Sequence, residues 1–123
     1  PDYLADARAL HDRLRRHSLI VLLTALRDED EEQLIAATRL LRRRHRVTVA
    51  SLREQVVDER LRAGVVSLDD AARWTTAIEY AQVREALIGR LRQRGVDVLD
   101  VPPSHLAVAL SNHYWRLKRA GSL

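Results

Sequence analysis

Cysteine is absent from the 123-residue chain, so disulfide bonds and thiolate metal sites are excluded. Methionine is absent as well and the chain begins at Pro1, so we expect it to be a portion of a longer protein. No apolar run approaches the roughly 18 residues needed to cross a bilayer, and no signal-peptide pattern is present. Only four glycines occur. The sequence accordingly contains no P-loop, no Gly-x-Gly-x-x-Gly fingerprint and no Gly-x-Ser-x-Gly elbow.

Positive charge is carried almost entirely by arginine, with Lys118 as the only lysine and a net charge of +4. Because arginine contacts phosphate in a bidentate manner, a nucleic-acid-binding fragment that uses surface arginines is the alternative function. Only Arg42, Arg43, Arg44 and Arg46 form a tight group, and they follow a predicted helix whose negative dipole end favours cations. Aromatic side chains that could stack on bases make up only 4% of the residues. Solvated helix surface is the simpler interpretation of the arginines.

Three short apolar segments, 18–26, 46–52 and 96–101, alternate with helical patterns and are predicted strands. Residues 53–66 fit either a short helix or a loop. Strands that alternate with helices favour a parallel sheet with right-handed crossovers. Segment 18–26 is apolar on both faces, so we expect helices to cover it on both sides. The predicted fold is α/β and three-layered, with a parallel sheet of three strands that forms half of a doubly wound, Rossmann-like domain.

Residues suited to begin or end a helix lie at the boundaries of the helical patterns. A serine or aspartate side chain can accept hydrogen bonds from the free amides of a first turn, and glycine readily takes the left-handed conformation that ends a helix. The predicted N-caps are Asp2, Asp28, Ser67 and Ser104, and the predicted stops are Gly95 and Gly121.

Several stretches together resemble a known family. They are "PDYLADARALHDRLRRHSLIVLLTAL", "LLRRRHRVTVASLRE" and "LRQRGVDVLDVPPSHLAVALSNHYWRLKRAGSL", the last of which carries the most specific pattern. They resemble the C-terminal half of the uncharacterised von Willebrand factor A-like proteins that are often encoded beside MoxR-type AAA+ ATPases. On this resemblance, residues 1–123 are the C-terminal portion of a von Willebrand A-like domain whose N-terminal half lies outside the sequence.

The resemblance implies a divalent-cation site, usually for magnesium, at the carboxyl ends of the strands. The family commonly has Thr-Asp after the central strand, where this chain has Thr24 and Ala25. Magnesium needs oxygen ligands, which a methyl group does not supply, so we expect a degenerate metal site and no cofactor. Asp28 fits a helix cap better than a ligand. Magnesium would bind only if an altered site survives, with Thr24 and an acid among Asp28, Glu29 and Asp30 as the open alternative.

No catalytic constellation is visible, so we do not expect an enzyme. The five histidines include no His-Glu-x-x-His pair, and the acid pairs lie at predicted helix starts, where the dipole alone favours them. The resemblance instead implies a noncatalytic protein-interaction module that acts with a MoxR-type AAA+ ATPase in complex assembly or maturation. Open parallel sheets bind partners at strand carboxyl ends, and the last helix offers a second surface. The candidate partner-binding residues are Thr24, Ala25, Asp28, Tyr114, Trp115 and Lys118, together with residues 53–66.

An apolar first strand at the edge of a sheet would leave backbone hydrogen-bonding groups unpaired. We therefore expect this chain to form a homodimer through the exposed edge of 18–26. The expected location is the cytoplasm, or the cytoplasmic face of a membrane in the full-length protein. Membrane contact would arise only through an N-terminal segment that this sequence does not contain.

Overall fold

The computed structural model describes residues 2–52 and 55–123, and the side chains of residues 55–58 lie outside that description. Within this part of the chain there are three strands and five α-helices, with two short 3-10 helices, η1 (Asp28–Asp30) and η2 (Pro103–His105). The strands are β1 (Leu19–Thr24), β2 (Arg46–Leu52) and β3 (Asp97–Val101). The helices are α1 (Tyr3–Arg13), α2 (Glu31–Leu41), α3 (Gln55–Ala63), α4 (Leu68–Gln93) and α5 (Leu106–Arg119).

The three strands are parallel and lie in the order β1-β2-β3. Each strand falls inside its predicted segment, and β2 coincides with residues 46–52. The register pairs Thr24 with Ser51 and Ser51 with Asp100, so the carboxyl ends of the strands are level with one another. We call this end of the sheet the carboxyl edge and the opposite end the amino edge.

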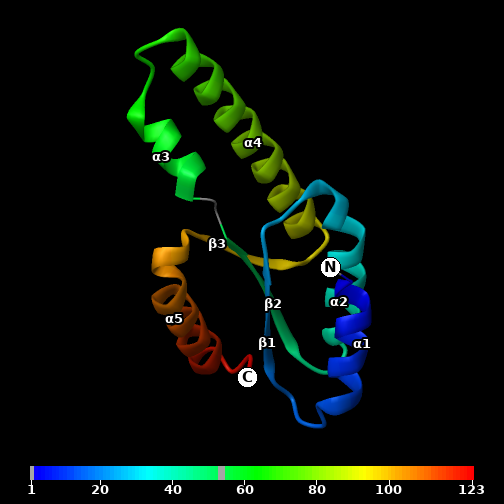
Figure 1. The fold of residues 1–123 in the computed structure, drawn as a ribbon. Helices are drawn as coiled ribbons and strands as arrows, with labels where there is room; N and C mark the ends of the chain where they lie inside the picture. Colours follow the sequence, from blue (N-terminus) through cyan, green and yellow to red (C-terminus); the bar gives the residue numbers. More distant parts are fainter. Residues whose placement is uncertain (1, 53–54) are drawn as a thin grey trace.

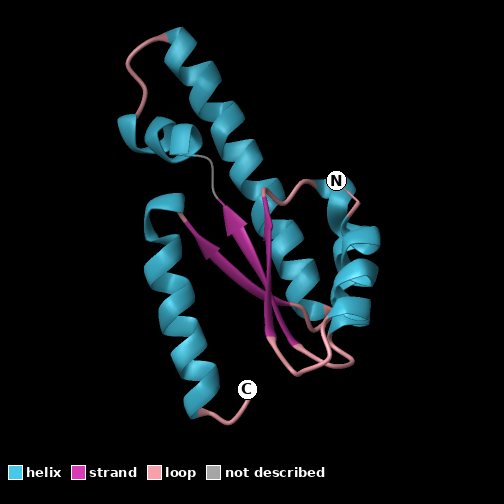
Figure 2. Cartoon of the chain, turned by 60° about the horizontal axis from the view of Figure 1, so that its bottom comes forward, coloured by secondary structure: helices cyan, strands magenta, loops and turns pink. Residues whose placement is uncertain are grey.

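The sheet lies between two layers of helices (Figures 1 and 2). Helices α1, α2 and α4 cover one face, while α5 lies alone on the other. The strand order advances in one direction, so two right-handed crossovers place α2 and α4 on the same face, where they contact each other. The predicted three-layer α/β fold is confirmed.

The hydrophobic core lies between the sheet and the layer of three helices. One cluster joins α2 and the C-terminal half of α4 to the middle of the sheet. A second cluster joins α1 and α2 to β1 and β2. Both clusters contain strand residues from the same face of the sheet, as the period of two along a strand requires. Their buried members are Leu26, Leu34, Ile35, Val49, Leu87, Ile88, Leu91, Val96 and Val98 in the first, and Ala7, Ile20, Ala37, Leu41 and Val47 in the second.

Strand β1 is not covered on both faces, which corrects one expectation. Ile20 is buried against the helices, but Leu19 and Val21 are only half-buried and Leu23 is 53% exposed. The reason is that α5, the single helix on that face, contacts β2 and β3 instead, through Thr48 and Asp97. Among the described strands β1 pairs only with β2, so it is an edge strand, as expected.

Two of the predicted helix starts are confirmed. The Asp2 carboxylate accepts a hydrogen bond from the amide of Ala5 at 3.0 Å, and the Ser67 hydroxyl accepts one from the amide of Asp70 at 3.1 Å. Ser104 does not cap α5, because it lies inside η2 and its hydroxyl is 3.5 Å from the ring of the next residue.

The predicted stops are confirmed by the backbone conformation. Gly95 has a φ of +82° just after α4, and the amide of Val96 reaches back to the carbonyl of Leu91 at 3.0 Å. This is the hydrogen-bond pattern of a Schellman motif, which favours glycine at the left-handed position. Gly121 takes the same conformation after α5, with a φ of +76°.

Helices α3 and α4 form a hairpin that stands beyond the carboxyl edge (Figure 1). Arg84 of α4 contacts the carboxyl ends of β2 and β3, so residues 68–83 lie beyond the sheet. Sixteen helical residues span about 24 Å. The segment 53–66, predicted as a helix or a loop, thus contains α3, and its residues 53 and 54 lie outside the described chain.

Candidate functional site

Thr24, the last residue of β1, is buried rather than available to a ligand. It is 3% exposed, and its hydroxyl lies 2.8 Å from the hydroxyl of Tyr3 in α1. The same oxygen accepts a hydrogen bond at 3.1 Å from the amide of Leu26, whose φ of +55° turns the chain sharply after the strand. Ala25, between them, is exposed. The hydroxyl of Thr24 therefore serves the turn that follows β1.

The acid run after β1 faces an arginine that lies far away in the sequence. Arg90 of α4 donates from Nε to Glu31 at 2.8 Å and from Nη2 to Asp28 at 3.2 Å. The hydrogen bond to Glu31, foremost, and the charge of Asp28 raise the pKa of Arg90 above its usual value. Two further acids of the run pair with Arg27, as Glu29 lies 3.3 Å and Asp30 3.6 Å from its guanidinium.

These ion pairs change the role expected for Asp28. Its carboxylate does not cap α2, because the N-cap position is Asp30, where no side-chain oxygen makes a capping hydrogen bond. Asp28 instead lies in η1 and fastens it to α4 together with Glu31. Within the described ranges, no group of three or more histidine, aspartate or glutamate side chains is arranged to hold a metal ion.

A buried polar cluster at the carboxyl edge was missed in the sequence analysis. Arg84, which is 5% exposed, places Nη2 2.7 Å from Oδ1 of Asp100 and also donates to the hydroxyl of Ser51. Thr24, Ser51 and Asp100 stand side by side in the register of the sheet. A polar row therefore closes the core at the carboxyl edge, and Arg84 from α4 and Tyr3 from α1 bind to it.

A second polar cluster joins α5 to the sheet. Oδ2 of Asp97 accepts a hydrogen bond from Thr48 at 2.7 Å and lies 3.0 Å from Nε2 of His113, which is also 3.0 Å from the Thr48 hydroxyl. In a hydrolase triad the carboxylate and the nucleophile contact opposite ring nitrogens, whereas here both contact Nε2. The cluster joins α5 to β2 and β3.

The three candidate residues on α5 lie together in the structure. The rings of Tyr114 and Trp115 meet edge to face with centroids 5.6 Å apart, and Nζ of Lys118 lies 5.6 Å from the Tyr114 ring centroid. Trp115 is 55% exposed, and Val108, two turns earlier on the same helix, is 64% exposed. These residues form an exposed surface that we call the α5 patch.

The turn between α3 and α4, together with the first residue of α4, carries the two most exposed large apolar side chains described. Val66 is 90% exposed, Leu68 is 89% exposed and Val65 is 52% exposed. They lie at the far end of the hairpin, away from the sheet. We call Val65, Val66 and Leu68 the hairpin tip. Exposed apolar side chains that cluster in this way are typical of contact surfaces.

The carboxyl-edge candidates thus separate in space from the α5 candidates. Thr24, Ala25 and Asp28 lie around the turn after β1, on the side of α1 and α4. The hairpin tip, which belongs partly to the predicted segment 53–66, extends the same end of the molecule. The sequence pattern did not predict the tip, because two adjacent valines and a leucine beyond Ser67 do not show whether they will be buried.

Scans of the chain against protein-family models, against curated proteins and against solved structures all find no match. The resemblance to von Willebrand A-like proteins therefore stays a prediction, while the α/β architecture is established by the structure. Among the helices of residues 2–52 and 55–123, none is both long and apolar enough to cross a membrane.

Proposed function

We propose that this chain is a noncatalytic protein-interaction module of von Willebrand A type, whose partner is a MoxR-type AAA+ ATPase. The module would act in complex assembly or maturation, in the cytoplasm or at the cytoplasmic face of a membrane. Its docking surface would be the carboxyl edge, extended by the hairpin tip. The family part of this proposal depends on the sequence resemblance alone.

The observation that carries the proposal is the exposure of the hairpin tip. Leaving Val66 and Leu68 in water forgoes the free energy of their burial, about 1.5 to 3 kcal/mol for each side chain if buried completely. The chain nevertheless presents both at the end of a hairpin that extends beyond the carboxyl edge, where residues 68–83 of α4 span about 24 Å along the helix axis. A helical hairpin with an apolar tip is suited to insert into a groove of another protein.

The acid run supports a docking role for this edge over a metal-binding one. Arg90 binds Asp28 and Glu31, so a magnesium ion there would first have to displace a guanidinium from both carboxylates. Because Asp28 remains 61% exposed in its side chain, it can still contact a partner. The altered metal site is therefore the weaker alternative, and a partner surface with a mixed apolar and charged character is favoured.

Binding to a purified MoxR-type AAA+ ATPase, measured by biolayer interferometry with and without magnesium, tests the proposal. We expect the double variant Val66→Ser, Leu68→Ser to weaken binding by about tenfold or more, since truncated apolar anchors dominate interface energies. The matched control is Val108→Ser with Trp115→Ser, which removes comparable apolar surface from the α5 patch. It should bind within about twofold of the unmodified chain.

Two results would count against the proposal in different ways. No binding by the unmodified chain, with or without magnesium, would reject the ATPase as partner. A loss of binding confined to the α5 variant would keep the partner but move the docking surface to Tyr114, Trp115 and Lys118.

A further inference from the structure

The last part of the chain concentrates positive charge on one helix. Residues 101–123 contain Arg116, Lys118 and Arg119 but no aspartate or glutamate, so this segment supplies three of the four net positive charges of the protein. Residues 1–100 carry nearly equal numbers of basic and acidic side chains. All three cations belong to the last turn of α5, the helix that lies alone on its face of the sheet (Figure 2). The surface around the end of α5 therefore has charge of one sign.

Each of these cations contacts an acceptor on its own helix that carries no negative charge. Nη2 of Arg116 lies 3.4 Å from Nδ1 of His113, and Nε of Arg119 donates to the carbonyl of Trp115 at 3.4 Å. Lys118 donates to a tyrosine hydroxyl one turn earlier at 3.3 Å. Among the described residues, no carboxylate forms an ion pair with any of the three.

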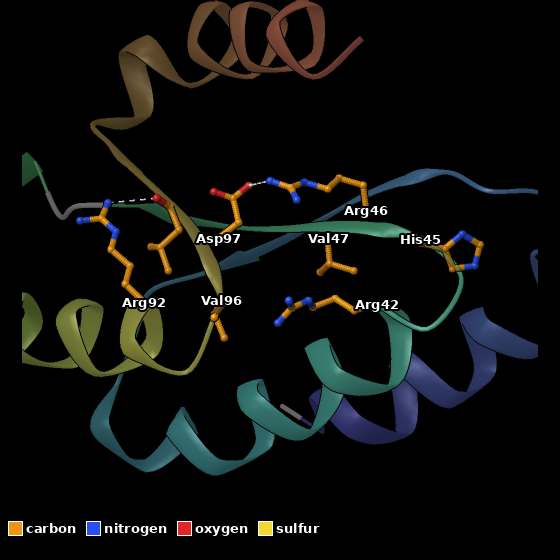
Figure 3. A pocket seen from close by; sticks show the side chains of 9 residues that line it. Arg42, His45, Arg46, Val47, Arg92, Val96 and Asp97 are labelled. Carbon is orange, nitrogen blue, oxygen red and sulfur yellow. Dashed lines mark hydrogen bonds and ion pairs between the residues drawn. The ribbon is translucent and has the colours of Figure 1, made fainter. Parts of the chain in front are cut away.

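Arginines beside the sheet differ in this respect, because carboxylates neutralise them within the fold. Nη2 of Arg46 lies 3.6 Å from Oδ2 of Asp97 (Figure 3), and Nη2 of Arg84 lies 2.7 Å from Oδ1 of Asp100. On α5 the positive charge stays open to a binding partner. Complementary charge on that partner would raise the rate of association and select it over other proteins.

An exposed tryptophan lies among these cations. Trp115 is more than half exposed, and its ring meets that of Tyr114 edge to face. Val108 lies two turns before Trp115 and Arg119 one turn after it, so the three residues share one stripe of the helix. Tryptophan is enriched among the residues that dominate the energy of protein interfaces. The outer face of α5 therefore combines an apolar anchor with positive charge.

An open hollow of about 470 Å³ continues this surface from α5 to β3. Arg116 and Arg119 line it together with Leu99, Ala109 and Asn112. Leu99 belongs to β3, which pairs only with β2 among the described strands and is thus an edge strand. Apolar side chains and two guanidinium groups together suit a polypeptide segment that carries both apolar and carboxylate side chains.

We infer that the α5 patch, together with Arg116 and Arg119, binds an acidic segment of a partner protein. An apolar side chain of that segment packs on Trp115, and its carboxylates bind the cations of the last turn. The inference does not rest on the ATPase proposal, which concerns the carboxyl edge and the hairpin tip.

A membrane surface and a nucleic acid fit this surface less well. A helix that lies in a membrane interface needs a wide apolar face. The leucines of α5 are buried or half-buried, which leaves Val108 and Trp115 as its exposed large apolar side chains. Single-stranded nucleic acid is bound by successive aromatic side chains on which bases stack, whereas Tyr114 is half-buried and Trp115 is the one exposed ring of this helix.

Titration with a synthetic peptide, followed by two-dimensional ¹H–¹⁵N NMR, tests the inference. The probe is a short peptide with a central pair of leucines between runs of glutamate. The chain has two tryptophans, so the indole N–H of Trp115 reports on the surface while that of Trp74, on α4, is an internal control. We expect a saturable shift of the Trp115 signal alone. The same peptide with serines in place of its leucines should bind about tenfold more weakly, since it lacks the apolar anchor.

The double variant Arg116→Glu, Arg119→Glu should weaken binding of the leucine peptide by about tenfold or more, because it replaces attraction with repulsion. The matched control is Arg8→Glu with Arg13→Glu, which reverses two exposed charges on α1, on the opposite face of the sheet. Both variants have the same net charge. At physiological ionic strength the control should stay within about twofold of the unmodified chain, since distant exposed charges are screened. The NMR spectrum of each variant shows whether it remains folded.

Four results would overturn the inference. An unshifted Trp115 indole would reject the surface. An equal loss of binding in the α1 variant would reduce the effect to long-range attraction by net charge. Equal affinity for the serine peptide would remove the apolar anchor. Phosphatidylserine vesicles or a single-stranded oligonucleotide that shift the Trp115 indole when the leucine peptide does not would assign this surface to a membrane or to nucleic acid instead.

Discussion

Arg84 lies on the apolar stripe of α4, at a position where the helical spacing predicts an apolar side chain. It follows Ala81 by three residues and precedes Ile88 by four, so it lies on the helix stripe that faces the sheet. An arginine there must find partners inside the protein, and Asp100 and Ser51 supply them. A charged residue on an otherwise apolar stripe is therefore a usable sequence signal for a buried ion pair, although its partners cannot be read from α4 alone.

The buried pair leads to a prediction about stability. Arg84→Met removes the guanidinium but keeps much of the side-chain volume, and it leaves Asp100 without its arginine at the end of the core. We expect the free energy of unfolding to fall by about 3 kcal/mol, as is typical when one member of a buried ion pair is removed. Urea denaturation followed by circular dichroism measures this loss.

Arg90→Met is the matched control for that experiment. It makes the same substitution six residues further along α4, where the guanidinium pairs with Asp28 and Glu31 at the surface. Exposed ion pairs contribute little to stability, so the loss should be much smaller than for Arg84→Met. Equal losses in the two variants would show that the carboxyl-edge pair contributes no more than a surface pair.

His45 links stability to pH at the other end of the sheet. The residue is 4% exposed, and its Nδ1 accepts a hydrogen bond from the amide of Ser18 at 3.1 Å. Burial, foremost, and then the nearby charges of His17, His11 and Arg44 lower the pKa of His45 below its usual value. The ring of His45 is therefore protonated at a lower pH in the folded protein than in the unfolded chain, where protonation occurs below about pH 6.5.

The lowered pKa predicts the direction of a pH effect. Below about pH 6.5 the unfolded state takes up a proton at this position while the folded state does not, so the free energy of unfolding should fall as the pH falls. His45→Asn keeps an acceptor for the Ser18 amide and should reduce this slope. Urea denaturation between pH 7.5 and 5.5 measures it, with His105→Asn, at an exposed position, as the control. An unchanged slope in His45→Asn would contradict the assignment.

At the scale of the elements, the sequence predicted correctly those helix caps that depend on contacts between residues close together in the chain. Asp2 and Ser67 cap their helices because the amides that they bind lie three residues away. Asp28 had the same local pattern, yet its carboxylate binds Arg90, 62 residues further along the chain. The left-handed turn at Leu26 and the 3-10 helix that follows present Asp28 to α4. Nothing in the local sequence distinguishes a capping aspartate from one that a distant arginine will bind.

The strands show the same division between local and distant determinants. β2 was predicted with its observed limits because β-branched residues fill a strand that is buried along most of its length. β1 was predicted as buried on both faces, but its second face is half-exposed, since α5 packs over β2 and β3. An apolar sequence reveals that a segment can be buried. Which neighbour covers it depends on the path of a helix more than eighty residues later.

At the scale of the whole molecule, the two faces of the sheet differ. Three helices and both hydrophobic clusters cover one face, while α5 alone covers part of the other (Figure 2). Strand β1 lies at the edge of the sheet with Leu23 on its thinly covered face. Edges of this kind favour pairing with another strand, because both backbone hydrogen bonds and apolar burial are available there.

We therefore predict that this chain forms a homodimer through β1. Leu23→Lys places a charge on the exposed face of the strand, which opposes edge-to-edge pairing, and should raise the dimer dissociation constant by about tenfold or more. Sedimentation equilibrium measures the constant. Val83→Lys is the matched control, because Val83 is 50% exposed but lies on α4 away from this edge, so its dimer should persist. An unmodified chain that stays monomeric at high concentration would contradict the prediction, and would show that a half-covered face and an open edge are not enough to drive pairing.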